Sequence, residues 1–130
     1  MRDVVLMFFL TCFLLSCDKV DPTPEDYSGK SIDVNLIGAW SRTYSGRDSN
    51  NGITIYSDTI RFTQDNMGTQ TTFRFSELFN HFPFQFYTQN NIILFRPEGM
   101  EDANRLDYHI LNDSLFIPRF GIPYVKSSVP

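Results

Sequence analysis

Cysteine is scarce in this chain of 130 residues: Cys12 and Cys17 are the two present, and both stand near the N-terminus. No disulfide can therefore cross-link the rest of the chain, so its stability must come from the burial of apolar side chains. Basic residues are not in excess either, since 11 Lys and Arg face 15 Asp and Glu. Affinity for a polyphosphate comes mainly from clustered Lys and Arg, so the composition argues against a nucleic-acid partner.

Long apolar runs are also missing, apart from one at the N-terminus. An apolar stretch from Val4 to Leu15 is 12 residues long, whereas a helix needs about 20 residues to span a bilayer. The stretch is typical of a signal peptide, which we expect to occupy residues 1–16. It ends in Leu14-Leu15-Ser16-Cys17, which resembles the lipobox of bacterial lipoproteins. The resemblance implies that Cys17 is the lipidated first residue of the mature chain and that Cys12 is removed.

A lipidated Cys17 would hold the protein on a membrane of the cell envelope, because several acyl chains together anchor a protein durably. The next residues, Asp18-Lys19-Val20-Asp21, resemble the charged sorting tracts that send some lipoproteins to the outer membrane. In other bacteria an aspartate after the cysteine signals retention at the inner membrane. We favour the outer membrane, at its periplasmic or surface face. Prolines, Gly29 and polar residues predict a flexible tether over residues 17–34.

Helical periodicity is absent from residues 35–130, where apolar and polar residues alternate in short segments. Turn residues separate these segments, and Asp65-Asn66-Met67-Gly68 is the strongest turn signal, because Asn and Gly tolerate positive φ. The predicted strands cover residues 36–44, 53–64, 69–76, 82–87, 92–96, 106–110, 115–117 and 121–127.

Alternation along these segments also predicts which side chains face inward. Phe82, Phe84 and Phe86 are expected to point into the core, and Phe73 and Phe75 to share one face. In the second segment the apolar parity changes between Ile55 and Ile60. A bulge or turn near Ser57 would explain that change.

About eight short antiparallel strands in consecutive hairpins form a sheet that can close on itself. Closure would also remove exposed sheet edges, which are a liability for an exported, Phe-rich domain. The length leaves room for one such domain. We therefore predict an all-β fold, a small antiparallel up-and-down β-barrel of about eight strands over residues 35–130.

Three segments resemble small bacterial lipocalin-like lipoproteins. Leu36-Ile37-Gly38-Ala39-Trp40-Ser41 resembles the Gly-x-Trp opening strand of lipocalins, residues 57–65 resemble the second strand, and residues 108–115 resemble a late hairpin. The resemblance implies a lipocalin-like barrel in which Trp40 plugs one end. It also implies a covering arginine from the last strands, and Arg119 is the nearest candidate for that barrel-closing pair.

Ten Phe follow Cys17, and their rings either line an apolar pocket or fill the barrel completely. The first hypothesis is a non-catalytic binding module for a small apolar ligand. The second is a solid-cored envelope protein that docks onto a protein or glycan partner. A cavity of about 300 Å³ or more would favour the ligand binder, and a packed interior would favour docking. The expected pocket residues are Trp40, Phe62, Phe73, Phe75, Phe84, Phe86 and Tyr108.

No catalytic constellation is evident, and we expect neither an enzyme nor a cofactor. Asp107 and His109 lie two residues apart on one strand face, but a solvent-facing pair explains that spacing equally simply. Ser114 follows Asp113 in a segment typical of a turn. His81 has no ligand-spaced partner, and the acidic loop of Glu98, Glu101 and Asp102 lacks the alternating spacing of a calcium loop.

Overall fold

A computed structural model describes residues 25–127 of the chain. Nine strands and two short 3₁₀ helices make up this part, and none of its helices has the length and apolar character needed to cross a membrane. In chain order the elements are η1 (Val34–Leu36), β1 (Gly38–Arg47), β2 (Ile53–Phe62), β3 (Met67–Arg74), β4 (Glu77–Gln89), β5 (Ile92–Pro97), β6 (Asn104–Asp107), β7 (His109–Leu111), β8 (Ser114–Phe116), η2 (Pro118–Phe120) and β9 (Tyr124–Lys126).

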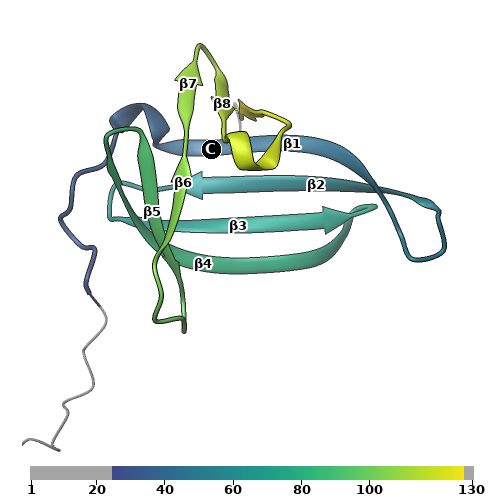
Figure 1. Cartoon of the computed structure of the whole chain (residues 1–130), viewed down its shortest axis with the longest axis horizontal. Helices are drawn as coiled ribbons and strands as arrows, with labels where there is room; N and C mark the ends of the chain where they lie inside the picture. The colour runs from purple at the N-terminus through teal and green to yellow at the C-terminus, as the bar shows by residue number, and fades with distance from the viewer. Residues whose placement is uncertain (1–24, 128–130) are drawn as a thin grey trace, which may run out of the picture.

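The strands form one antiparallel sheet in the order β6-β5-β4-β3-β2-β1-β9-β8-β7. The two strands at the ends of this order, β6 and β7, are separated along the chain by Tyr108 alone. One extended segment therefore pairs with β5 through its first half and with β8 through its second half, which nearly closes the barrel (Figure 1). The predicted all-β, up-and-down barrel is confirmed. Its nine strands become the expected eight when β6 and β7 are taken as one.

Short turns join the long strands. Asn66 has a φ of 64° between β2 and β3, as the turn signal predicts. Phe75 and Ser76, at 51° and 79°, form a turn between β3 and β4. A phenylalanine at positive φ is unusual, because its Cβ crowds the backbone there. The strand that was predicted to run to Ser76 therefore ends at Arg74.

The bulge predicted near Ser57 is wrong. The registers of β2 with β1 and with β3 run through Ser57 without a break. Ile53 and Ile55 simply face outward at the far end of β2, so no change of parity is needed. The register shift lies between β3 and β4 instead, where Phe79 is the extra residue.

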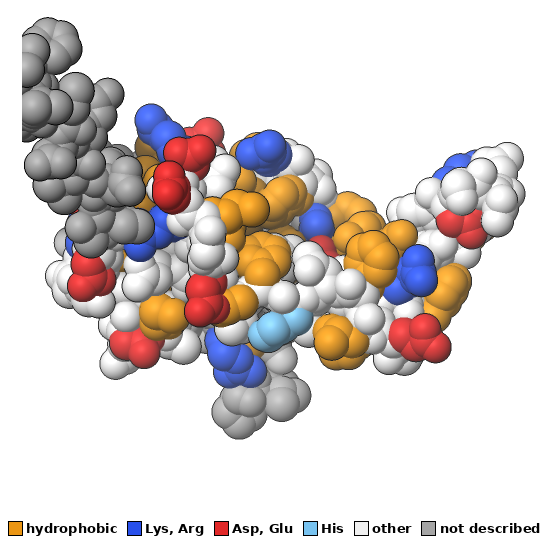
Figure 2. Space-filling view, turned by 90° about the horizontal axis from the view of Figure 1, so that it is seen from below, with side chains coloured by type: hydrophobic (Ala, Val, Ile, Leu, Met, Phe, Trp, Pro, Cys, Tyr) orange, Lys and Arg blue, Asp and Glu red, His pale blue; other side chains and the backbone are white. Residues whose placement is uncertain are grey.

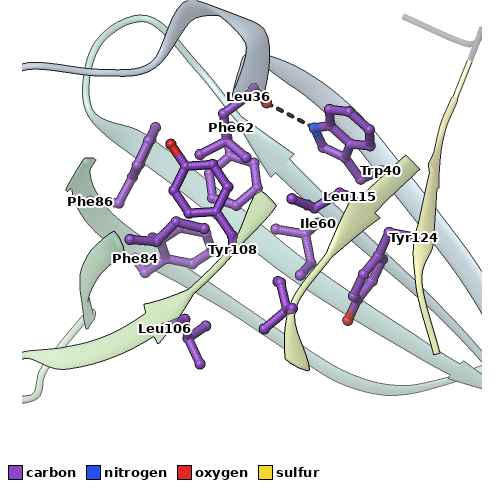
Figure 3. Packing of buried hydrophobic residues seen from close by; sticks show 12 residues of the cluster. Leu36, Trp40, Ile60, Phe62, Phe84, Phe86, Leu106, Tyr108, Leu115 and Tyr124 are labelled. Atoms are coloured by element: carbon purple, nitrogen blue, oxygen red, sulfur yellow. Dashed lines mark hydrogen bonds between the residues drawn. The ribbon is translucent and has the colours of Figure 1, made fainter. Parts of the chain in front are cut away.

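Buried aromatic and aliphatic side chains fill the barrel, and Tyr108 lies among Phe62, Phe84 and Phe86 (Figure 3). Phe62 meets the Phe86 ring edge-on with centroids 4.9 Å apart, a favoured geometry for aromatic pairs. The complete buried cluster is Leu36, Trp40, Ile60, Phe62, Phe84, Phe86, Ile93, Leu106, Tyr108, Leu115, Ile117 and Tyr124.

The described part of the predicted tether packs on this barrel. Tyr27 is buried against Tyr87, with ring centroids 4.9 Å apart. The side chain of Asn66 accepts from the Gly29 amide and donates to the Lys30 carbonyl. Packed structure thus begins before residue 35 in the described chain.

Strands β1 to β4 continue beyond their neighbours and leave one end of the barrel uncovered (Figure 1). The partner β9 pairs with β1 only at Trp40 and Ser41, and β5 pairs with β4 only from Phe84 to Gln89. We call this four-stranded extension the open end. It consists of residues 43–47, 53–57, 73–74 and 77–82.

Candidate functional site

The apolar interior has almost no free space. An apolar cavity among its buried side chains holds about 40 Å³, and the walls include Ile60, Phe62, Phe84, Ile93 and Leu106. One water molecule occupies about 30 Å³ in the liquid, so the cavity has no room for a drug-sized ligand, which needs about 300 Å³. The cavity is far smaller than the volume of about 300 Å³ that would favour a ligand binder, so the interior is packed.

The structure brings five of the seven predicted pocket residues together. Phe62 and Phe84 line the small cavity, and Trp40, Phe86 and Tyr108 are buried in the same cluster. The prediction is wrong for the remaining two, Phe73 and Phe75. Phe73 faces outward, since it pairs with Ser57 of β2, and Phe75 stands exposed in the β3–β4 turn.

Trp40 is fully buried, and its indole N–H donates to the Leu36 carbonyl at 2.8 Å. The cation over its ring is Lys126, with Nζ 5.3 Å from the centroid. Arg119 is exposed in η2. The predicted partnership of Trp40 with Arg119 is therefore corrected, because β9 rather than η2 runs beside Trp40.

A buried ion pair marks the boundary between the apolar core and the open end. Arg42 donates through Nε and Nη2 to Oδ2 of Asp58 at 3.0 and 2.9 Å. The Thr72 hydroxyl donates to the other carboxylate oxygen at 2.7 Å. Asp58 is 1% exposed, so this charge depends on these partners. Arg42 also donates through Nη1 to the carbonyls of Phe120 and Ile122, which fastens η2 to β1.

Tyr124 adds an unpartnered hydroxyl to the ion-pair region. Its ring lies 4.6 Å from the Arg42 guanidinium, and its oxygen is the one buried side-chain polar atom in the described residues without a hydrogen bond. Burial raises the pKa of this phenol, and the nearby Asp58 carboxylate raises it further against an opposing effect of Arg42. The hydroxyl is therefore protonated at neutral pH.

A ladder of rings and cations continues from Arg42 across the inner face of the open end. The guanidinium of Arg42 lies 4.6 Å from the Tyr44 ring, which stacks on Tyr56 with centroids 5.3 Å apart. Tyr56 meets Phe79 edge-on at 5.8 Å, and Arg74 lies over Phe79 at 5.1 Å. Arginine and aromatic side chains dominate the strongly contributing positions of protein interfaces.

Large apolar side chains are also exposed around the open end. In Figure 2 hydrophobic side chains gather on the viewed face, toward the projecting hairpin. A separate groove of about 400 Å³ at this end is lined by Thr54, Arg74, Phe75 and acidic side chains. A contiguous exposed apolar patch commonly marks an interaction site. The exposed large apolar side chains of the open end, which we call the exposed apolar patch, lie on both faces of the sheet and are Ile53, Ile55, Phe73, Phe75, Leu78 and Phe79.

The two histidines contact neighbouring aromatic or hydroxyl side chains. His109 stacks on Phe116, with centroids 4.7 Å apart, and Nδ1 of His81 is hydrogen-bonded to the Thr71 hydroxyl. Ser114 begins β8 directly after the turn at Asn112. No group of three or more His, Cys, Asp or Glu suited to a metal occurs in residues 25–127.

The acidic loop residues Glu98, Glu101 and Asp102 are exposed. Two of them line a groove of about 430 Å³ beside Arg96 and Pro97. Cys17 and the first part of the tether lie outside the described residues.

Comparison with protein-family models, curated proteins and solved structures finds no match to this chain.

Sequence reasoning missed the inward direction of Arg42 and Asp58, although a signal was present. Asp58 shares its parity with Ile60 and Phe62, and Arg42 shares its parity with Trp40. Because side chains alternate along a strand, these two charges had to face inward together with the core residues.

Proposed function

We propose that this chain is a lipid-anchored protein of the cell envelope that docks onto a protein partner through its open end. The packed interior carries this proposal, since a cavity of about 40 Å³ leaves no space for the apolar ligand of the alternative hypothesis. The exposed apolar patch and the ring-and-cation ladder supply instead an external surface that includes the aromatic and arginine residues typical of binding hot spots.

The position of the chain's start supports the same orientation. The described chain begins beside the β4–β5 hairpin, on the opposite side of the molecule from the projecting β1–β2 hairpin (Figure 1). An anchor at Cys17 would therefore hold the barrel near the membrane by the first of these sides. The open end would point away from the membrane toward a partner.

Photo-crosslinking in cells tests the docking proposal, with photoreactive leucine placed singly at Leu78 or Leu111. The two side chains match closely, because Leu78 is 63% exposed at the open end and Leu111 is 61% exposed at the β7–β8 hairpin. We expect a discrete crosslinked protein from position 78 and none from position 111. Equal crosslinking from the two positions, or none from position 78, would contradict docking through the open end.

The anchor is tested separately by Cys17→Ala. This variant should leave the membrane fraction, because no acyl chain can be attached. Continued sedimentation with membranes would refute the lipidation of Cys17 without bearing on the docking surface.

A further inference from the structure

Strand β4 has a free backbone edge at the open end. Its register with β5 begins at Phe84, so residues 77–82 have no strand on that side in the described chain. After Pro97 the chain turns away at Gly99, whose φ is 80°. No other strand of the described chain therefore takes the position that β5 would occupy beside the first half of β4.

Backbone hydrogen bonds show which groups of β4 face this edge. The carbonyl of Pro83 accepts the Glu98 amide on the β5 side, and the Phe86 amide donates on the opposite side to Asn66. In an antiparallel strand the side alternates with each residue. The N–H and C=O of His81 thus point to the free edge, while Asn80 is paired with Thr72 of β3.

Apolar side chains flank this edge on both faces of the sheet. Leu78 lies on the outer face beside Phe73, its register partner, and Phe79 lies near Tyr56 on the inner face. Arg74 stands exposed over Phe79. Its register partner Glu77 lines the same groove, but Arg74 makes no salt bridge within residues 25–127. An occupant would need apolar groups for both faces and a negative charge for Arg74.

We infer that the free edge of β4 accepts an extended strand of a protein partner, which carries apolar side chains and a carboxylate that meets Arg74. This inference rests on the docking function proposed above and names its mode. Strand addition supplies affinity through main-chain hydrogen bonds and specificity through flanking side chains. The bulge at Phe79 twists the edge, so the pairing centres on His81 and stops at Phe79.

A second copy of this chain fits the edge less well than a foreign strand. If two β4 edges paired antiparallel, a two-fold axis would relate the two copies. The two barrels would then point in opposite directions. The starts of the described chains would then lie at opposite ends of the dimer. Two lipid anchors at opposite ends of a dimer could not both hold it to one membrane with each open end pointing away from that membrane.

The test is selection from a display library of decapeptides against the mature, lipidated chain in detergent. Alternate library positions are apolar, and one central position varies among Glu, Gln and Lys. We expect enrichment of Glu-containing peptides. These peptides should bind at least tenfold more weakly to His81→Pro, because this substitution removes the edge N–H and leaves the Asn80 pairing in place. His81→Ala, which keeps the N–H, should bind within twofold of the unmodified chain. Arg74→Glu should shift the enrichment from Glu to Lys.

Methylation of alternate peptide nitrogens provides a matched control, because it removes main-chain donors and leaves the side chains unchanged. Loss of binding on methylation supports strand addition. Absence of enrichment would overturn strand addition. Methylated peptides that bind as well as unmethylated ones, or undiminished peptide binding to His81→Pro, would overturn it too.

Unfolding curves of His81→Pro establish that the variant is folded. Crosslinking at Leu78 that persists in His81→Pro cells would reject strand addition and retain docking, whereas absence of any Leu78 crosslink would reject docking itself. Dimers crosslinked through Leu78 would identify a second copy as occupant and also overturn the inference.

Discussion

Replacing Asp58 with Asn should destabilise the barrel strongly, because it leaves the Arg42 guanidinium buried without a counter-ion. The Arg42 side chain is 9% exposed and its hydrogen bonds to Asp58 measure 2.9 and 3.0 Å. Removing one partner of a buried ion pair typically costs about 3–5 kcal/mol. Thr72 can still donate to the amide oxygen of Asn, and Arg42 keeps two carbonyl acceptors. We therefore expect Asp58→Asn to lower the free energy of unfolding by about 3 kcal/mol, the lower end of that range.

The double variant Arg42→Met with Asp58→Leu supplies the control. Apolar side chains that replace both members of a buried pair are often neutral or stabilising. The free energy of unfolding of the double variant should therefore lie within about 1 kcal/mol of that of the unmodified protein, or above it. The difference between single and double variants isolates the cost of the uncompensated charge.

Urea denaturation of the three proteins measures these free energies. With an m-value of about 1.5 kcal/mol per molar, a loss of about 3 kcal/mol lowers the midpoint by about 2 M. A single variant within about 0.5 kcal/mol of the unmodified protein would refute the reasoning, since most surface substitutions cost no more. A double variant as unstable as Asp58→Asn would show that the loss comes from packing rather than charge.

Three further predictions concern the barrel interior. Tyr124→Phe should raise the free energy of unfolding by about 1 kcal/mol, because it removes an unpartnered buried hydroxyl. Tyr108→Phe should lower the free energy of unfolding by about 1–2 kcal/mol, because it removes the 2.9 Å hydrogen bond to Asp33. Equal urea midpoints for the two variants would contradict this prediction. Gly68→Ala should cost about 1–3 kcal/mol by thermal unfolding, since a Cβ there would lie 2.3 Å from the Phe84 ring, and an unchanged melting temperature would refute the close packing. The raised pKa of Tyr108 and Tyr124 means that the folded state retains these protons more strongly, so stability is complete below the ordinary tyrosine pKa of about 10 and falls as the pH rises above it. Urea midpoints that stay constant from pH 9 to 11 would oppose that assignment.

Alternation and turn chemistry were sufficient to predict the all-β barrel. The inward directions of Trp40, Phe84 and Phe86 follow from a period of two, and the Asn66 turn fixes the β2–β3 hairpin. Closure through Tyr108 was not predicted in detail, because it depends on one segment that pairs with two different neighbours. Such long-range pairing leaves no local pattern in the sequence.

The candidate site was predicted less well, for two separate reasons. Pairing Phe62 with Gly68 places the even-numbered residues of β3 inward, so the outward position of Phe73 follows from a register that the turn already sets. The open end has a different origin. It arises because β5 and β9 are short relative to β1 and β4, and relative strand ends are the least reliable part of a sequence-based assignment.

Native mass spectrometry of the mature protein, purified gently from its own host, tests the central claim most directly. A barrel with an apolar cavity of about 40 Å³ should carry no small molecule, so the observed mass should equal that of the lipidated chain, alone or with a protein partner. A stoichiometric small apolar molecule that stays with the folded barrel and is released on unfolding would contradict the packed interior and with it the docking function.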